Sequence, residues 1–460
     1  MTPSHPKNQR VHLKTVVPGP KSLALRERED AHIAPGLQGY AVMAGVVADR
    51  AEGSAVTDVD GNVLLDFIGG IGVGALGHSH PKVVDAIRDQ VTKISVGSLT
   101  SEARVDLVER VAAHAPKNAK GDALHRLQLY SSGAEAVESA LRLAKSHTGK
   151  YEVVSFWGGF HGKTMGALSL MGSTFKEKLG PMLPGSHLLP YADCYRCPLA
   201  LEHPSCGLAC VDVGRKHLKM AGAGAVAAFI AEPMQGTAGN VVPPDDFLVA
   251  VESLAKEHDA LFIADEMITG FGRTGRYWGH GHSGARPDIV TIGKAFGGGF
   301  PLSGLLTSDA VAQAKPWSIP SGSSSSYGGN ALGAAAGAAA VRAIDEEGLV
   351  ENSRAVGEAL LGALRPFVDA YPFVGTVRGR GLFLALELVK DKKTKEPMSK
   401  KATTRIFQEC VRRGLLTMSY SPHFRIQPAL TIDVDTAKNG VAILREVFDL
   451  VLREGFWAEG

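Results

Sequence analysis

The chain has 460 residues, 45% of them hydrophobic, which is enough to bury a large core and indicates two structural lobes. Lysine and arginine total 49 against 47 acidic residues, so the net charge of +2 offers no strong field for nucleic acid or an anionic membrane and favours a small-molecule partner. Because residues 1–21 lack the apolar core of a secretory signal and no later stretch is apolar enough to span a bilayer, we expect a cytoplasmic protein.

The order of predicted elements indicates a small β-unit, an α/β body and a final α+β segment. Short β-like runs at 53–57 and 63–67 flank a turn. Apolar runs at 225–231, 260–264 and 288–292 alternate with helical and glycine-rich stretches, which is typical of an α/β sheet covered by helices. After about Ala340 the pattern predicts a helix, short strands within 377–388, and helices at 401–413 and 434–454. We therefore expect a large domain at 71–340 and a small domain formed by 1–70 and 341–460.

Three of the apolar runs end in ionisable residues. Glu232 and Asp265 each close a run, and Lys294 ends a third one just before a glycine-rich loop. For any one of them, a helix cap or a side chain leaving for solvent is about as common as a functional group. Ligands of open α/β sheets bind at the carboxyl ends of strands, so the three together indicate a site in which a desolvated lysine is an amine nucleophile.

Two further segments suit a planar, anionic ligand. The turn Ser131-Ser132-Gly133 precedes a helical pattern and would present amide groups and hydroxyls to a phosphate, although an ordinary serine cap with Glu135 is commoner for such a segment alone. The aromatic residues within 157–162 would stack on a flat ring or pack in the core. Pyridoxal phosphate is planar, anionic and reactive toward amines, and carries a basic ring nitrogen, so it would use all of these groups.

The chain resembles the class III aminotransferases, which include ornithine, 4-aminobutyrate and other ω-amino transaminases, from about Gly39 to Phe448. The resemblance rests on ordered motifs at 60–67, 77–81, 132–136, 160–162, 232–236, 265–275, 294, 326–330 and 378–382. It implies fold type I, with a large domain around a mostly parallel seven-stranded sheet and a smaller α+β domain. It also implies pyridoxal phosphate as cofactor and a homodimer with shared active sites, which can associate further into a dimer of dimers.

The resemblance also implies roles for individual residues. Lys294 is the Schiff-base lysine and proton shuttle, Asp265 pairs with the pyridine nitrogen, and Glu232 orients the site near Asp265. The remaining cofactor-binding positions are Ser132, Gly133 and Ala134 at the phosphate, Phe160 on the ring with His161 beside it, and Ser326 with Tyr327 at the phosphate of the neighbouring subunit.

Substrate recognition is expected to involve Arg425 and Ile71. Arg425 matches the family's substrate-carboxylate arginine, for which a guanidinium fork is suited, and Ile71 indicates an apolar pocket wall. Thr237 stands where ornithine- and 4-aminobutyrate-type members carry a glutamate that pairs with the arginine. The substrate choice of those enzymes is therefore not transferred to this chain.

The implied reaction moves an amino group from an ω-amino acid, a diamine or an amine to a 2-oxo acid by a ping-pong mechanism. A racemase or a decarboxylating relative is the alternative within the same cofactor class. A non-enzymatic metal- or ligand-binding protein is disfavoured because Lys294, Asp265 and the phosphate turn are intact.

Four cysteines are crowded into the short segment 194–210. Cys194 and Cys197 form a C-x2-C pair, and Cys206 and Cys210 form a C-x3-C pair. Four thiolates at this spacing could bind a structural zinc ion, but unligated thiols or paired disulfides explain the same pattern. Cys410 lies in a helical stretch and is expected to pack in the core.

Overall fold

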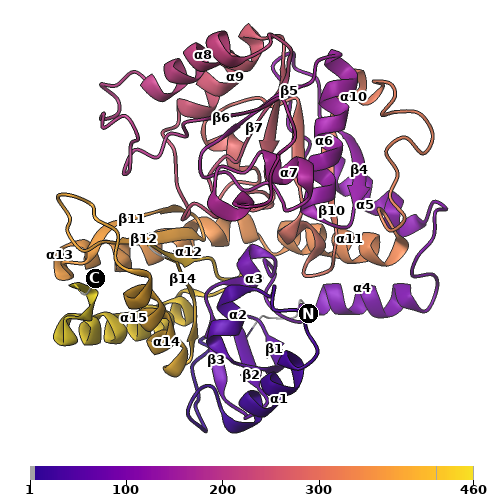
Figure 1. Cartoon of the computed structure of the whole chain (residues 1–460). Helices are drawn as coiled ribbons and strands as arrows, with labels where there is room; N and C mark the ends of the chain where they lie inside the picture. Colours follow the sequence, from indigo (N-terminus) through magenta and orange to yellow (C-terminus); the bar gives the residue numbers. More distant parts are fainter. Residues whose placement is uncertain (1–5, 421, 459–460) are drawn as a thin grey trace. The chain divides into compact units, whose positions relative to one another are not determined.

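The structure is a computed structural model that describes residues 6–420 and 422–458 (Figure 1). The chain forms two compact units. One combines Met1–Pro81 with Gly348–Gly460, and the other consists of Lys82–Glu347.

Residues 82–347 fold around a seven-stranded sheet of order β4-β10-β9-β8-β7-β5-β6. Its strands are β4 (Arg126–Tyr130), β5 (Glu152–Phe156), β6 (Ser186–Leu189), β7 (Val226–Ala231), β8 (Leu261–Asp265), β9 (Ile289–Ile292) and β10 (Ser303–Thr307). β10 is antiparallel to both of its neighbours, and the other pairs are parallel. The prediction of a mostly parallel seven-stranded sheet is confirmed.

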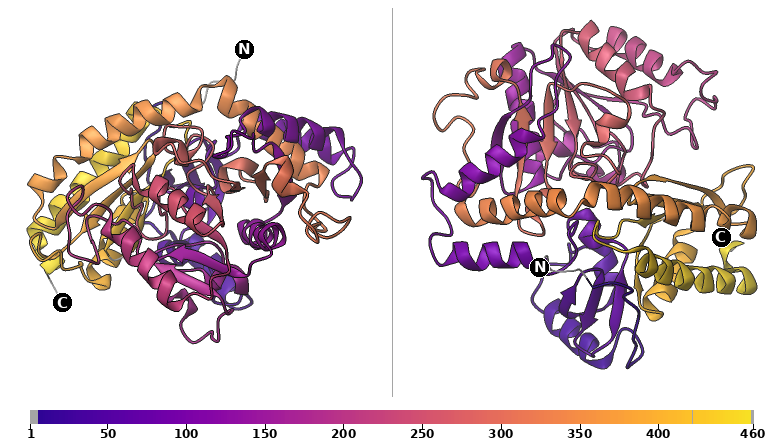
Figure 2. Two further views of the ribbon diagram at one scale, coloured as in Figure 1. Left: turned by 90° about the horizontal axis from the view of Figure 1, so that it is seen from above. Right: turned by 180° about the vertical axis from the view of Figure 1, so that it is seen from behind.

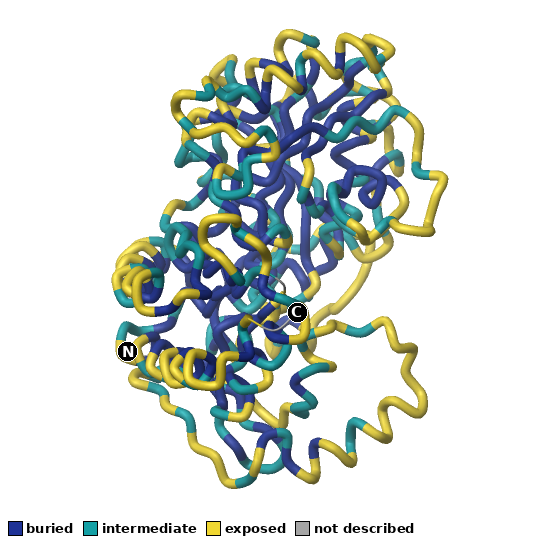
Figure 3. Tube along the Cα trace, turned by 60° about the vertical axis from the view of Figure 1, so that its left-hand side comes forward, coloured by how far each residue is buried: buried dark blue, intermediate teal, exposed yellow. Residues whose placement is uncertain are grey.

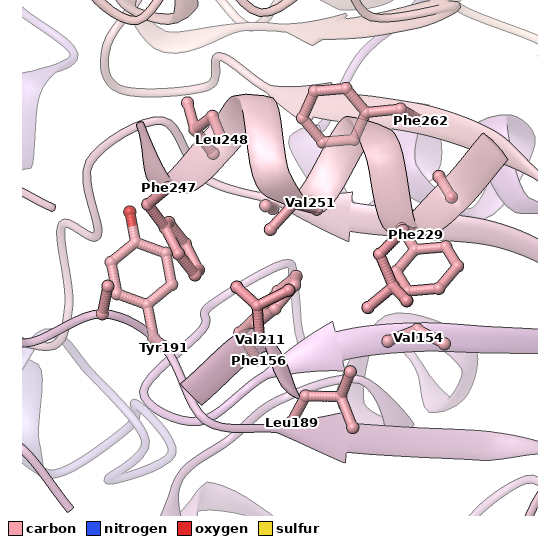
Figure 4. Packing of buried hydrophobic residues seen from close by; sticks show 14 of the residues in the cluster. Val154, Phe156, Leu189, Tyr191, Val211, Phe229, Phe247, Leu248, Val251 and Phe262 are labelled. Atoms are coloured by element: carbon pink, nitrogen blue, oxygen red, sulfur yellow. The ribbon is translucent and has the colours of Figure 1, made fainter. Parts of the chain in front are cut away.

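Both faces of this sheet are buried, which explains why its strands are continuous apolar runs. Successive side chains of a strand point to opposite faces. Phe229 and Phe262 therefore pack into one apolar cluster, with Phe247 and Val251 of a covering helix (Figure 4). Their chain neighbours, among them Ile230 and Ile263, pack into a second cluster on the other face.

Helices cover the two faces in separate layers. On one face α6 (Gly133–Thr148) contacts five of the strands, and on the other α8 (Ala209–Ala221) and α9 (Phe247–Glu257) pack beside each other (Figures 1 and 2). The dark strands inside lighter outer segments in Figure 3 show the same layering by burial. The other helices of this unit are α4 (Pro81–Val91), α5 (Glu102–Ala113), α7 (Met165–Ser169), α10 (Asp309–Ala312) and α11 (Ala331–Glu346), with 3-10 turns η1 (Thr174–Lys176), η2 (Gly279–His282) and η3 (Lys294–Gly297).

The other unit joins the two ends of the chain through a shared sheet. Its order is β1-β2-β3-β13, in which β3 (Val63–Asp66) pairs in parallel with β13 (Leu415–Leu416). A second, antiparallel sheet has the order β11-β12-β15-β14. The remaining strands are β1 (Ala48–Glu52), β2 (Ala55–Asp58), β11 (Val374–Arg380), β12 (Phe383–Leu388), β14 (Met418–Tyr420) and β15 (His423–Ile426). The predicted small α+β domain is confirmed as a fold.

The helices of this unit include the two that the sequence predicts near its end. α14 (Lys400–Arg412) lies within a residue of the expected limits, and α15 (Val434–Glu454) begins and ends where expected. The others are α1 (Pro20–Asp30), α2 (Gly39–Ala44), α3 (Gly69–Gly72), α12 (Leu349–Leu364) and α13 (Phe367–Ala370), with the 3-10 turn η4 (Phe456–Ala458). Across the described parts of the chain, no helix has the length and apolar character that crossing a bilayer requires.

Candidate active site

The three ionisable strand ends lie at one edge of the sheet. Glu232 follows the last residue of β7, Asp265 is the last residue of β8, and Lys294 follows β9 after one glycine. These strands are neighbours and run in parallel, so their carboxyl ends meet at the same edge. The loop that carries Phe160 and His161 leaves this edge from β5.

Asp265 is a buried carboxylate held by three donors. It is 1% exposed, and its Oδ1 accepts hydrogen bonds from Thr291 Oγ1 at 2.9 Å and from the Met267 amide at 3.2 Å. Its Oδ2 accepts one from His161 Nδ1 at 2.7 Å. Burial alone would lower the pKa of His161, but the hydrogen bond to Asp265 and the charge of that carboxylate raise it overall. The arrangement fixes the position of a carboxylate to which a protonated ring nitrogen could donate a hydrogen bond.

Glu232 fixes the loop that follows β5. One carboxylate oxygen accepts from the Phe160 amide and the other from the Gly236 amide, each at 2.9 Å. Burial raises the pKa of Glu232, and Asp265 raises it further, against the opposing effect of His161. The Phe160 ring meets Phe175 edge to face, with centroids 5.9 Å apart. Glu232 therefore sets the backbone position from which Phe160 and His161 project.

Lys294 has an unusual backbone conformation. Its φ of +45° lies in the left-handed region, which costs free energy for a residue with a side chain. Gly293 precedes it, and a Cβ at that glycine would lie 2.6 Å from the Met267 sulfur. Such strain is commonly retained at functional positions, so the backbone marks the same lysine that the sequence pattern selects.

The first turn of α6 is suited to an anion. Ser132 caps the helix by accepting from the Glu135 amide, and the Glu135 side chain accepts from the amides of Ser131 and Ser132 in return. By position, the amides of Gly133 and Ala134 have no acceptor within the helix. The buried Ser131 hydroxyl also has no hydrogen-bond partner among the described residues. The serine cap is present, and unused donors beside it are compatible with binding of a phosphate, which remains a prediction.

Ser326 and Tyr327 are not gathered around Asp265 in this chain. Ser325, just before them, donates a hydrogen bond to Glu135 Oε1 at 3.2 Å, so the segment passes the start of α6. Ser326 is exposed, and Tyr327 is 64% exposed. Both side chains are therefore accessible to solvent in the single chain.

Arg425 and Ile71 belong to the other compact unit. Arg425 lies in β15, is 4% exposed, and its guanidinium contacts the sulfur of Met418. Ile71 adopts φ +63°, which is rare for a β-branched residue, in a short left-handed segment. The Gln427 amide donates a hydrogen bond to the Phe67 carbonyl at 2.7 Å. The segment that carries Arg425 therefore contacts the segment just before Ile71 within this unit.

The structure adds groups that sequence reasoning missed. Thr291 faces Asp265 across the register of β8 and β9, and it is the polar position of an otherwise apolar strand, which is the signal that could have identified it. Glu266 is buried and accepts from the amides of Gly279 and His280 and from His280 Nδ1, at 2.9, 2.8 and 2.7 Å. This network fastens the loop that follows Asp265.

The donor set fits pyridoxal phosphate. Asp265 provides the buried acceptor for a ring nitrogen, Lys294 the amine, and the start of α6 the amides and the unpaired Ser131 hydroxyl for a phosphate. A Cβ at Gly162 would lie 2.8 Å from that of Ala134, so the loop of Phe160 is packed directly on the first turn of α6. The groups that would bind the ring and those that would bind the phosphate therefore lie next to each other.

Comparison with known proteins supports this interpretation. The family model for class III aminotransferases matches residues 38–448. A 5-aminovalerate aminotransferase of Pseudomonas aeruginosa is 35% identical over 88% of this chain and 93% of its own. A leucine/methionine racemase of Thermococcus litoralis is 32% identical over 86% of this chain and 89% of its own.

Solved structures agree with the sequence comparison. An amine transaminase from an uncultivated Pseudomonas species, in its pyridoxal-phosphate-bound form, superposes with a TM-score of 0.84 at 30% identity, covering 91% of this chain and 98% of that one. An (S)-enantioselective ω-transaminase from Thermomicrobium roseum gives a TM-score of 0.86 at 30% identity, covering 93% and 98%.

Proposed function

Because the chain belongs to the class III aminotransferases, we propose that it moves an amino group from an ω-amino acid, a diamine or a simple amine to a 2-oxo acid in a ping-pong sequence. Pyridoxal phosphate is the cofactor. One observation carries the proposal: a buried, triply hydrogen-bonded Asp265 shares a sheet edge with the strained Lys294.

We propose that the groups along the edge described above hold the cofactor. Ser132 and the amides of Gly133 and Ala134 bind the phosphate, with the Ser131 hydroxyl as an additional donor. Phe160 covers the ring, and Asp265 binds its nitrogen. When bound, pyridoxal phosphate supplies an electrophilic carbon that accepts amines and a ring that accepts electrons.

Lys294 carries the protons of the reaction. Its Nζ would hold the cofactor as the amine nucleophile. When not bound to the cofactor, the same Nζ would act as general base, taking a proton from the substrate carbon that bears the amino group, and would then serve as the acid that gives the proton back. Asp265 keeps the ring nitrogen protonated, and His161 with Thr291 holds the carboxylate in place.

Arg425 binds the carboxylate of the 2-oxo acid, for which a buried guanidinium is suited. Thr237 is exposed and neutral, so this chain has no acidic side chain at that position to pair with Arg425 when a donor lacks an α-carboxylate. The 5-aminovalerate and 4-aminobutyrate relatives support an ω-amino acid as donor, and Ile71 supplies an apolar wall for its methylene chain.

We further propose a cytoplasmic homodimer. Exposed apolar side chains are concentrated at 94–99, where Leu99 is 82% exposed, and Tyr327 is exposed as well. Thr100 and Arg104, just after this apolar run, line a hollow together with Gly328 and Gly329, which follow Tyr327. An exposed apolar patch of this kind is typical of a protein interface. Ser326 and Tyr327 would then reach the phosphate of the neighbouring copy. Sedimentation at a series of concentrations tests the dimer, and cell fractionation tests the location.

The visible absorption spectrum of the purified protein tests the function. The yellow band of the lysine-bound cofactor is expected before substrate, and one class of donor should bleach it in the absence of any acceptor. Lys294→Ala should abolish turnover, whereas Lys93→Ala, which removes a surface lysine paired with Asp89, should leave it unchanged. No band after adding cofactor, or substantial transamination by Lys294→Ala, would refute the proposal.

A racemase is the second candidate, because a leucine/methionine racemase is among the relatives. Racemisation interconverts the two enantiomers of an amino acid and needs no 2-oxo acid, whereas transamination forms an oxo product that depends on the acceptor. Chiral chromatography of single enantiomers incubated with and without 2-oxoglutarate or pyruvate distinguishes the two reactions.

A further inference from the structure

The connection between β6 and α8 is long and irregular. It runs from Leu189 to Ala209 as a succession of turns with no helix or strand. Loops of this length within a compact unit are uncommon unless something holds them. The segment begins on the core, where Tyr191 packs with Phe156 and Phe247, and it returns to the core at Cys210 and Val211 (Figure 4).

All four cysteines of this connection surround one space. Cys194, Cys197, Cys206 and Cys210 line a single small cavity of about 20 Å³, together with apolar side chains of the same segment. None of them forms a disulfide.

We propose that these four cysteines form a structural zinc site that fastens the connection between β6 and α8. The cysteines form two short pairs, C-x2-C and C-x3-C, and both pairs contribute to the lining of this one cavity. Four sulfur ligands at the corners of a tetrahedron are the usual structural site for zinc.

The chemistry of the cluster is compatible with a bound zinc ion. Each thiol binds as a thiolate and releases its proton to solvent, so one divalent ion with four thiolates leaves a centre of charge −2. Arg196, which lies between Cys194 and Cys197, offers a positive charge close to it. Among the described residues no three metal-binding side chains converge as they would on a bound ion, so the thiols must turn inward to close the site.

The site would connect to the catalytic edge through Tyr191. Its hydroxyl donates to the carbonyls of Glu232 and Pro233 at 3.0 and 3.2 Å. Tyr191 precedes the first cysteine by three residues, so fastening the connection also fixes a contact behind Glu232. The inference does not depend on the proposed reaction, because metal content and spectra are measured without substrate.

The experiment is metal analysis of the full-length holoenzyme, purified under reducing conditions without chelator from zinc-supplemented cells. About one zinc ion per chain is expected. Co²⁺ exchanged for zinc should show the thiolate-to-metal charge-transfer absorption of a tetrahedral sulfur site. Cys197→Ser and Cys206→Ser should lose both the zinc and the cobalt bands, whereas Cys410→Ala, which removes a buried cysteine outside the cluster, should keep them.

Limited trypsin digestion measures independently whether zinc restricts the motion of the connection between β6 and α8. Cleavage at Arg196 should accelerate when zinc is removed from the wild-type protein, and should be fast in Cys206→Ser with or without zinc. The proposal is overturned if the reduced wild-type protein binds neither zinc nor cobalt. It is equally overturned if Cys197→Ser and Cys206→Ser retain the full metal content, or if peptide mapping shows these cysteines paired as disulfides in the protein as isolated.

Discussion

Thr291→Val isolates the part that hydrogen bonding to Asp265 plays in the reaction. Valine keeps the shape of threonine and removes only the hydroxyl, which lies 2.9 Å from the carboxylate. Thr291 is fully buried, so water does not replace the lost donor, and His161 and the Met267 amide remain. Threonine at this position is therefore a positioning residue whose removal leaves the charge of Asp265 intact.

The size of the effect follows from the kind of bond removed. A hydrogen bond to a charged group contributes roughly 1.5–3 kcal/mol, and about 1.4 kcal/mol corresponds to a factor of ten in rate. If the whole contribution is expressed in the transition state, kcat/KM falls by roughly 10- to 150-fold. A smaller fraction of bound cofactor at limiting concentration should accompany the loss.

Thr307→Val is the matched control. Thr307 is as buried as Thr291 and lies on β10 of the same sheet, but its hydroxyl donates to the Asp288 carbonyl at 3.0 Å, away from the site. Steady-state kinetics at saturating cofactor and urea unfolding are measured for both variants. Each should lose stability, but only Thr291→Val should lose rate. Equal kcat/KM values for the two variants would refute the role given to Thr291.

Two further predictions concern stability. Because the pKa of His161 is raised in the folded protein, its attraction to Asp265 stabilises the fold fully below the ordinary histidine value of about 6.5 and is lost as the pH rises through the folded-state pKa. The difference in Tm between the wild type and His161→Asn should therefore shrink as the pH is raised. A difference that stayed constant with pH in calorimetry would contradict this prediction. On α12, Gly357→Ala should lower the free energy of unfolding by about 1–3 kcal/mol or more, because the new Cβ would lie 2.1 Å from the Gly381 carbonyl oxygen. Gly362→Ala, which has open space around it, should instead raise the free energy of unfolding by roughly 0.5–1 kcal/mol. Urea unfolding that gave both changes the same sign would contradict this description of the packing.

Local patterns predicted the elements well where one physical rule determines them. α15 was predictable because apolar residues repeat at helical spacing, Asp433 caps its start and Gly455 ends it in the left-handed conformation. β7 and β8 were predictable because a strand buried on both faces is a short, continuous apolar run.

Pairings between distant segments could not be predicted in the same way. The residues Ser303–Thr307 do not show that this strand lies antiparallel between β4 and β9. The residue types of a short buried strand do not specify which strands it pairs with or in which direction. Likewise the contact between His161 and Asp265 joins residues 104 positions apart. The sequence pattern selected both residues, whereas their hydrogen bond depends on the loop that Glu232 holds.

The left-handed backbone of Lys294 was also beyond sequence reasoning. A lysine at a strand end predicts an amine at the site, but its residue type gives no indication of a φ of +45° or of the close packing of Gly293 against Met267. Residue types could therefore be identified from the sequence, and their exact orientation required the fold.

The pairing of β3 with β13 has a consequence for how the protein is made. Leu415 leaves the ribosome about 350 residues after Asp66, which at roughly 5–20 residues per second is about half a minute. During that time the strands near the N-terminus lack their final partner, while residues 82–347 can complete their own sheet. We expect the N-terminal strands to remain open to chaperones until synthesis is nearly finished. Protease digestion of ribosome-bound chains stalled before and after Leu415 would show whether the N-terminal strands become resistant to cleavage only once β13 has been synthesised.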